Sequence, residues 1–129
     1  MDQQAIRELT AGPAADRLVH EVVFGYRWDP AQARWVGPDG RADLPQEVPP
    51  YTSSMESALT VGRAMRGWGY VTFGQLTGHD PPVYVLAFHR PDQTVNLDRD
   101  VATGPDFPLV WCQAALLALA RERSLGAIR

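Results

Sequence analysis

Lysine is absent from this chain of 129 residues, and all twelve basic side chains are arginine. A GC-rich genome is a sufficient cause of that usage. Its physical consequence is that every cation carries a planar guanidinium, which pairs with carboxylate or phosphate and stacks on aromatic rings. The formal net charge is −3 and the isoelectric point is near 5.5. This balance argues against a general nucleic-acid binder, which carries an excess of basic side chains, and leaves open only a local basic patch.

Cysteine and long apolar runs are also scarce. The single cysteine, Cys112, excludes an internal disulfide framework and a zinc site built from several cysteines. No apolar run approaches the roughly 20 residues of a membrane span. The first residues, MDQQAIREL, lack the basic-then-apolar order of a signal peptide. We therefore expect a soluble, intracellular protein without a membrane partner.

Patterns that carry catalysis or bind metal are missing as well. The chain contains no P-loop, no dinucleotide fingerprint and no G-x-S-x-G motif. His20, His79 and His89 lack metal-ligand spacing. Cys112 falls on the apolar stripe of a predicted helix, which favours a buried thiol over a nucleophile. His79 and Asp80 fall in a predicted turn, where a solvated pair is the simpler interpretation. We expect no enzymatic activity, no catalytic residue, no metal site and no cofactor.

Apolar periodicity and turn residues predict one α/β (α+β) domain over residues 1–129, with residues 1–12 as an N-terminal extension or short helix. Its core is a small antiparallel sheet of two to three strands, packed with two main helices plus the short N-terminal helix. The expected elements are a short helix within 2–10, a helix over 13–24, an aromatic hairpin over 26–36, a proline- and glycine-rich connector over 37–52, a central helix after residue 53, strands at 70–76 and 83–89, a weaker third strand around 98–102, and a closing helix from about 106.

The central helix is the strongest local signal. Ser53 and Glu56 have the spacing of a capping box, and Gly67 and Gly69 can supply the left-handed conformation that ends a helix. Apolar residues recur every three to four positions, which predicts one buried stripe. The stripe consists of Met55, Ala58, Leu59, Gly62 and Met65, with Trp68 as a further candidate.

Two other patterns carry expectations about burial. In the helix over 13–24, the spacing places His20 and Glu21 toward the polar side. In the strand over 83–89 both alternating faces are apolar, so we expect cover on both sides, from helices or from a partner subunit.

The order of these signals resembles the phage ABA sandwich domain family over about residues 13–123. The motifs are RLVHEVVFGYRW, a second tryptophan followed by P-D-G, PPYTSSMESALTVGRAM, and PLVWCQAAL in the closing helix. The chain departs from the family pattern at Ser54, where an aspartate is frequent, and in a longer loop over 90–105. The resemblance implies a small layered α/β fold and a viral origin. It supplies no catalytic residues.

Two clusters suggest binding of a small anionic or nucleotide-like ligand. Helix N-termini attract phosphate, and arginine forks and aromatic rings suit a nucleotide. The candidate residues are Arg27, Trp28, Arg34 and Trp35 in the hairpin, and Tyr51, Thr52, Ser53 and Ser54 before the central helix. A purely structural interpretation stays open, in which Ser53 only caps the helix and the tryptophans only cover the core.

Two functional hypotheses follow. The first is a non-enzymatic, virus-encoded binding protein of the host cytoplasm, a homo-oligomer that sequesters a nucleotide-derived signalling molecule as a counter-defence sponge. The alternative is a protein–protein interaction module, either an inhibitor of a host protein or a virion-assembly adaptor, because tryptophan, tyrosine and arginine dominate interface hot spots.

Overall fold

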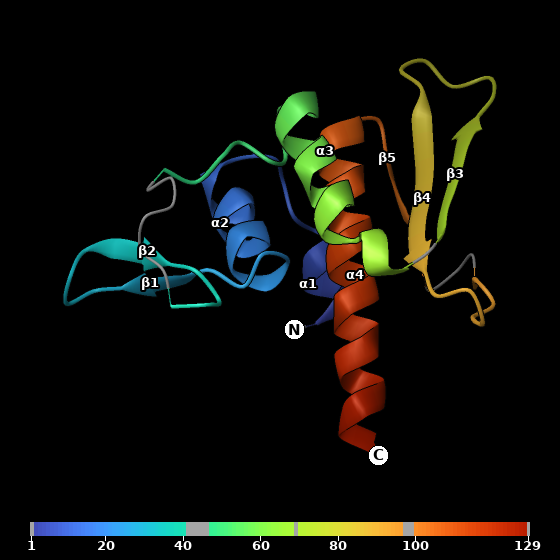
Figure 1. Cartoon of the computed structure of the whole chain (residues 1–129). Coiled ribbons are helices and arrows are strands. Elements are labelled where there is room, and N and C mark those ends of the chain that lie inside the picture. Colours follow the sequence, from blue (N-terminus) through green and yellow to red (C-terminus); the bar gives the residue numbers. More distant parts are fainter. Residues whose placement is uncertain (1, 41–46, 69, 97–99, 129) are drawn as a thin grey trace.

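A computed structural model describes residues 2–40, 47–68, 70–96 and 100–128, and the predicted fold class is confirmed (Figure 1). Over these residues the chain is a compact α+β domain of four helices and two antiparallel sheets. The elements in chain order are α1 (Gln3–Arg7), α2 (Pro13–Val22), β1 (Arg27–Asp29), β2 (Arg34–Val36), α3 (Met55–Ala64), the 3-10 turn η1 (Arg66–Trp68), β3 (Tyr70–Leu76), β4 (Val83–His89), β5 (Ala102–Gly104) and α4 (Phe107–Ile128).

The two sheets lie at opposite ends of the molecule (Figure 1). The hairpin β1-β2 pairs Trp28 with Trp35, and the larger sheet has the antiparallel order β3-β4-β5. The strands expected at 70–76 and 83–89 are confirmed at these bounds. The third strand begins at Ala102 and pairs there with Leu86, whereas residues 98 and 99 of its expected range lie outside the described residues.

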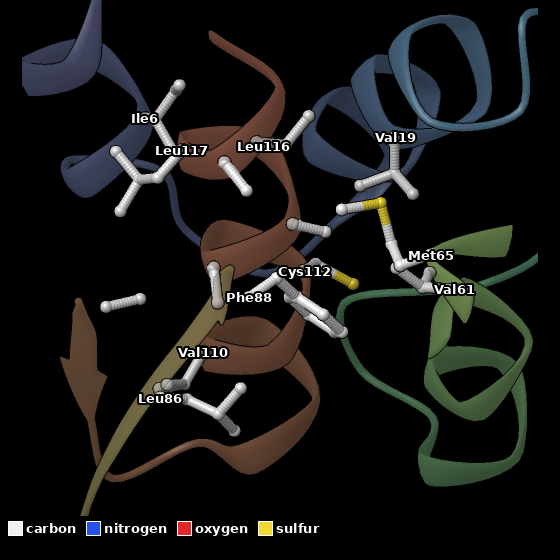
Figure 2. Packing of buried hydrophobic residues seen from close by; sticks show 14 of the residues in the cluster. Ile6, Val19, Val61, Met65, Leu86, Phe88, Val110, Cys112, Leu116 and Leu117 are labelled. Atoms are coloured by element: carbon white, nitrogen blue, oxygen red, sulfur yellow. The ribbon is translucent and has the colours of Figure 1, made fainter. Parts of the chain in front are cut away.

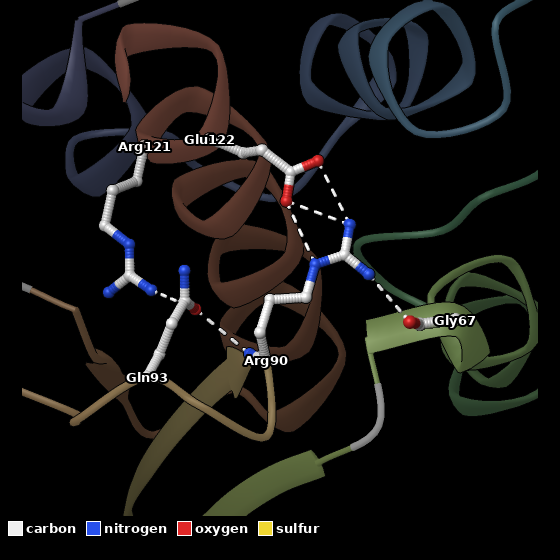
Figure 3. Close-up of polar contacts among 5 residues, drawn as sticks. All are labelled: Gly67, Arg90, Gln93, Arg121 and Glu122. Carbon is white, nitrogen blue, oxygen red and sulfur yellow. Dashed lines mark hydrogen bonds and ion pairs between the residues drawn. The ribbon is translucent and has the colours of Figure 1, made fainter. Parts of the chain in front are cut away.

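Polar contacts tie the residues on either side of the β4-β5 connection to α4. The Asp100 carboxylate accepts a hydrogen bond from the Asn96 amide at 2.8 Å and forms an ion pair with Arg121 of α4 at 2.7 Å. Figure 3 shows a neighbouring group of contacts, in which the Arg90 guanidinium forms an ion pair with Glu122 of α4 and donates a hydrogen bond to the Gly67 carbonyl at 2.7 Å. Arg90 after β4 and Asp100 before β5 are therefore both paired with side chains of α4, and the pairing of β5 with β4 begins at Ala102.

Helix α4 runs through the middle of the core. Side chains from α1, α2, α3 and β4 converge on it, as Ile6, Val19, Val61 and Phe88 show in Figure 2. From Cys112 to Ala118 every side chain of α4 is at most 5% exposed. A helix that is apolar on all sides must be covered on all sides, so α4 determines where the other elements pack.

Helix α3 departs from its predicted cap and stripe. Ser54, not Ser53, is the N-cap, and its hydroxyl accepts a hydrogen bond from the Ser57 amide at 3.3 Å. Ala58, Val61 and Met65 are buried as the face toward α4. The expected stripe was wrong at Met55 and Leu59, which are 48% and 51% exposed.

The contact with α4 decides which face of α3 is buried. A Cβ atom at Gly62 would lie 2.8 Å from Cζ2 of Trp111, so the missing side chain lets the indole pack directly on the helix. The predicted stop at Gly67 was also wrong, because this glycine lies in the 3-10 turn η1 and is not among the residues with a left-handed φ. Gly69, its suggested companion, lies outside the described residues.

Substituting Gly62 by alanine tests the contact between α3 and α4. Trp111 is held by Phe88 and Phe107, with ring centroids at 4.9 and 5.7 Å, so the indole has little room to move. Overpacking destabilises a folded protein by about 1–3 kcal/mol. The higher helix propensity of alanine relative to glycine offsets about 1 kcal/mol of that loss. We expect Gly62→Ala to lower the free energy of unfolding by about 1 kcal/mol in urea denaturation.

The matched control is Gly67→Ala, because a Cβ atom there meets no atom within 4 Å. We expect this control to keep wild-type stability. If Gly62→Ala were as stable as the control, the packing of Trp111 on α3 would not be the constraint we describe.

Candidate functional site

The tryptophan hollow lies between α2 and the β1-β2 hairpin. It has a volume of about 350 Å³ and is lined by Pro13, Asp16, Arg17, Trp28, Trp35 and Val48. Trp28 and Trp35 pair directly across the hairpin and therefore share one face, where their rings meet edge to face with centroids 5.5 Å apart. The Arg17 guanidinium lies 5.3 Å from the Trp35 ring centroid. The hollow thus combines two indole rings with one cation.

Asp16 fixes the inner wall of the tryptophan hollow. Its Oδ1 accepts hydrogen bonds from the Thr52 amide at 2.8 Å and from the Thr52 hydroxyl at 2.6 Å. The Thr52 hydroxyl oxygen in turn accepts from the Gly12 amide at 3.0 Å. Asp16 and Thr52 are both buried, at 7% and 1% exposure. These bonds join the start of α2 to the connector before α3, so Thr52 has a structural role.

A layer of rings lies beneath Trp35. The buried His20 shares a hydrogen bond between its Nδ1 and the Tyr51 hydroxyl at 2.8 Å. Its imidazole stacks on Tyr26 at 4.1 Å and meets Trp35 edge to face at 4.8 Å. The prediction that His20 faces the polar side was wrong. Residue 20 lies one turn after Asp16, and both follow the face of α2 that packs on the connector.

Burial shifts the protonation equilibria of this layer toward neutral groups. It lowers the pKa of His20, and the nearby Glu21 offsets this only in part. Burial raises the pKa of Tyr51 and raises that of Cys112 to about 12. The Cys112 thiol also donates to the Tyr51 carbonyl at 3.3 Å. At neutral pH, Cys112 is a protonated thiol, as expected for a structural cysteine, and not a thiolate nucleophile.

The eight predicted ligand residues fall into three groups. Trp28 and Trp35 meet at the tryptophan hollow. Arg27 and Arg34 are exposed, and because strand residues alternate between faces they lie on the face opposite the indoles. Of the four residues before α3, Tyr51 and Thr52 are buried by their partners, Ser53 is exposed and Ser54 caps the helix.

Sequence reasoning missed Arg17, which supplies the cation that the structure places beside the tryptophans. Its sequence signal, the i,i+4 pair with Glu21 at 3.0 Å, is that of an ordinary surface ion pair. Only the packing of the hairpin against α2 brings its guanidinium over Trp35. Nothing in the local spacing of residues 13–24 indicates that contact.

A second hollow, the α3 groove, lies between α3 and the larger sheet. It is larger, at about 530 Å³, and is lined by Leu59, Gly62, Arg63, Met65, Arg66, Val71, Phe88 and Trp111. Its walls are mostly apolar, and the Trp111 indole nitrogen is buried without a hydrogen-bond partner in the part of the chain that the structure describes. None of the predicted ligand residues lines this groove.

No protein-family model matches the chain, and searches of curated proteins and of solved structures found no significant match. The resemblance to the phage ABA sandwich domain family therefore stays a prediction from the quoted motifs. Within residues 2–40, 47–68, 70–96 and 100–128, no helix has the length and apolarity needed to cross a membrane. The same residues hold no group of three or more His, Cys, Asp or Glu side chains that could bind a metal ion.

The buried His20 predicts an acid-sensitive fold. Its pKa in the folded chain lies below the ordinary 6.5, so on acidification the unfolded chain takes up the proton first. The stabilisation from neutral His20 is complete above pH 6.5 and is lost as the pH falls toward the folded pKa. We expect the free energy of unfolding to fall below pH 6.5, with a contribution from His20 of at most about 1.4 kcal/mol per pH unit.

Urea denaturation between pH 5 and 7.5 measures this dependence. His20→Asn keeps an amide near the Tyr51 hydroxyl but does not titrate, so its stability curve should be flatter than that of the wild type. His79→Asn is the matched control because His79 is exposed. Parallel curves for the wild type and His20→Asn would contradict the prediction.

Proposed function

We propose that this protein is a non-enzymatic binding protein and that the tryptophan hollow takes a small, planar, nucleotide-like ligand. The observation that carries the proposal is the convergence of Trp28, Trp35 and the Arg17 guanidinium on one hollow of about 350 Å³. This volume lies within the usual range for small-molecule sites. A nucleobase would stack on the indoles, since aromatic stacking accepts any base, and an anionic group would pair with Arg17.

The charges around the tryptophan hollow suggest how such a ligand is oriented. The buried Asp16 carboxylate disfavours a phosphate near the inner wall, so the base lies inward and the anionic group outward, beside Arg17. The Arg17–Glu21 ion pair is exposed, with side-chain exposures of 54% and 38%. Exposed pairs of this kind are worth about 0–1 kcal/mol, so the guanidinium can turn to a ligand at low cost.

The biological role is the finer part of the proposal. The resemblance to the phage ABA sandwich domain family supports a viral origin, and a nucleotide-like ligand then suggests a counter-defence sponge in the host cytoplasm. Such a protein binds a nucleotide-derived immune signal stoichiometrically and needs no catalytic group. We expect it to act as a homo-oligomer.

Calorimetric titration with cyclic nucleotides and ADP-ribose derivatives tests the proposal. For a ligand that binds saturably, we expect Trp28→Ala and Arg17→Ala each to weaken binding about tenfold or more, because base–aromatic stacking is worth about 1–3 kcal/mol and charged hydrogen bonds about as much. Arg27→Ala is the matched control and should stay within about twofold of the wild type, since Arg27 lies on the other hairpin face.

Two outcomes would contradict the proposal. One is the absence of saturable binding across the whole ligand set. The other is binding that Trp28→Ala and Arg17→Ala leave unchanged, which would move the site away from the tryptophan hollow.

The exposed hairpin favours a second candidate function, a protein–protein interaction module. Trp28 is 37% exposed, and the exposed Arg27 and Arg34 lie on the opposite face of the same hairpin. Tryptophan and arginine are the commonest hot-spot residues. A host-protein inhibitor or virion-assembly adaptor should lose its partner on both Trp28→Ala and Arg34→Ala in a pull-down. A small ligand in the hollow depends on Arg17 and not on Arg34, so these variants separate the two functions.

A further inference from the structure

Strand β3 is a long open edge of the larger sheet. It pairs with β4 along all seven residues, from Tyr70 opposite His89 to Leu76 opposite Val83. The sheet order β3-β4-β5 leaves its other side without a strand partner in the described part of the chain, and Figure 1 shows β3 on the outside of the sheet. The unpaired N–H and C=O groups of such an edge can bind another strand.

The sequence of β3 lacks the residue types that block such pairing. Residues 70–78 contain no charged residue and no proline, the devices with which monomeric proteins protect an edge. Instead, Val71, Phe73 and Leu76 are 44%, 54% and 47% exposed. The opposite edge, β5, is only three residues long, and a short edge strand offers little for another strand to pair with.

The apolar surface continues from the β3 edge onto the helical side. Val71 and Phe73 pair with Phe88 and Leu86, both buried in the core, so all four lie on the sheet face that packs on α4. Val71 also lines the α3 groove together with the half-exposed Leu59. A strand added at β3 would therefore gain backbone hydrogen bonds and would also bury apolar side chains against the existing core.

We propose that the occupant of this edge is β3 of a second copy of the chain, antiparallel, with a two-fold axis at Phe73. In this register all seven residues overlap, Phe73 pairs with Phe73 of the second copy, and Val71 pairs with Gln75. An aromatic pair directly across two antiparallel strands is favourable. The two sheets then join in the order β5-β4-β3-β3-β4-β5.

Charge favours a second copy over a foreign strand. The residue on the two-fold axis lies opposite its own copy, so a charged residue at position 73 would meet a like charge, and β3 contains no charged residue. A foreign partner selected by charge complementarity would find no charge to complement on β3. Closed two-fold dimers are also the commonest oligomers. The inference is independent of the nucleotide-like ligand, because the β1-β2 hairpin, whose tryptophans line the hollow, and β3 lie at opposite ends of the molecule (Figure 1).

Cysteine cross-linking tests the register directly. The native Cys112 is buried with a pKa of about 12 and does not compete. Directly opposite residues have Cα atoms about 4.5–5.5 Å apart, within the range of a disulfide, so Phe73→Cys should form a covalent dimer under mild oxidation. Gln75→Cys is the matched control, because its two copies lie roughly 14 Å apart in this register. A mixture of Val71→Cys and Gln75→Cys chains should cross-link again.

Light scattering coupled to size-exclusion chromatography gives the second measurement. We expect the wild type at twice the 14.3 kDa mass of the chain. Phe73→Glu should weaken the dimer by about 100-fold or more, because it sets two carboxylates against each other at the axis. Met55→Glu, which changes an equally exposed apolar residue on α3, should leave the dimer intact.

A monomeric wild type at high protein concentration would overturn the proposal and leave the edge to a different partner. A dimer in which Phe73→Cys does not cross-link, or in which Gln75→Cys cross-links equally well, would overturn this register. Neither result bears on binding at the tryptophan hollow, so failure of this inference and failure of the proposed function remain distinguishable.

Discussion

Burial of α4 on all sides is the constraint on which the rest of the structure depends. From Cys112 to Ala118 the helix has no polar face, and its one polar side chain there, Gln113, is satisfied by donating to the Ile6 carbonyl at 3.1 Å. That bond also ties the end of α1 to α4. A helix of this kind is stable in water only when neighbours cover its whole circumference. Helices α1, α2 and α3 and the larger sheet are those neighbours. Their positions follow from the need to cover α4 on all sides.

The tryptophan hollow forms where this core ends. Helix α2 contacts α4, and the β1-β2 hairpin lies on the far side of α2 from α4 (Figure 1). The edge-to-face contact between Trp35 and His20 holds the hairpin on α2. The hydrogen bonds that Asp16 accepts from Thr52 fix the connector behind the hairpin. A site at such a junction can change its side chains without disturbing the main core. Binding and catalytic residues are concentrated in peripheral segments for the same reason.

The two surfaces that we assign to partners have opposite chemistry. The tryptophan hollow combines aromatic rings with a guanidinium and a carboxylate, which suits a small polar ligand with a planar part. The β3 edge offers unpaired backbone and uncharged, half-exposed side chains, which suit another strand. In a dimer joined through β3, the two hollows lie at the far ends of the assembly. Each hollow is complete within one chain, so occupancy of one need not change the other.

The main helices and strands of this protein follow from short-range signals in the sequence. Pro13 at the first turn of α2, Gly25 with φ 75° after it, and the strand-like runs at 70–76 and 83–89 with a turn between them act between residues a few positions apart. These signals predicted the fold class and the main strands. They also brought Trp28 and Trp35 together, because a hairpin is local. Tertiary structure alone decided that His20 is buried, that Leu59 is exposed, and that Arg17 and not Arg27 meets the indoles. These outcomes depend on which face of a helix packs on a distant segment, and local spacing carries no information about that choice.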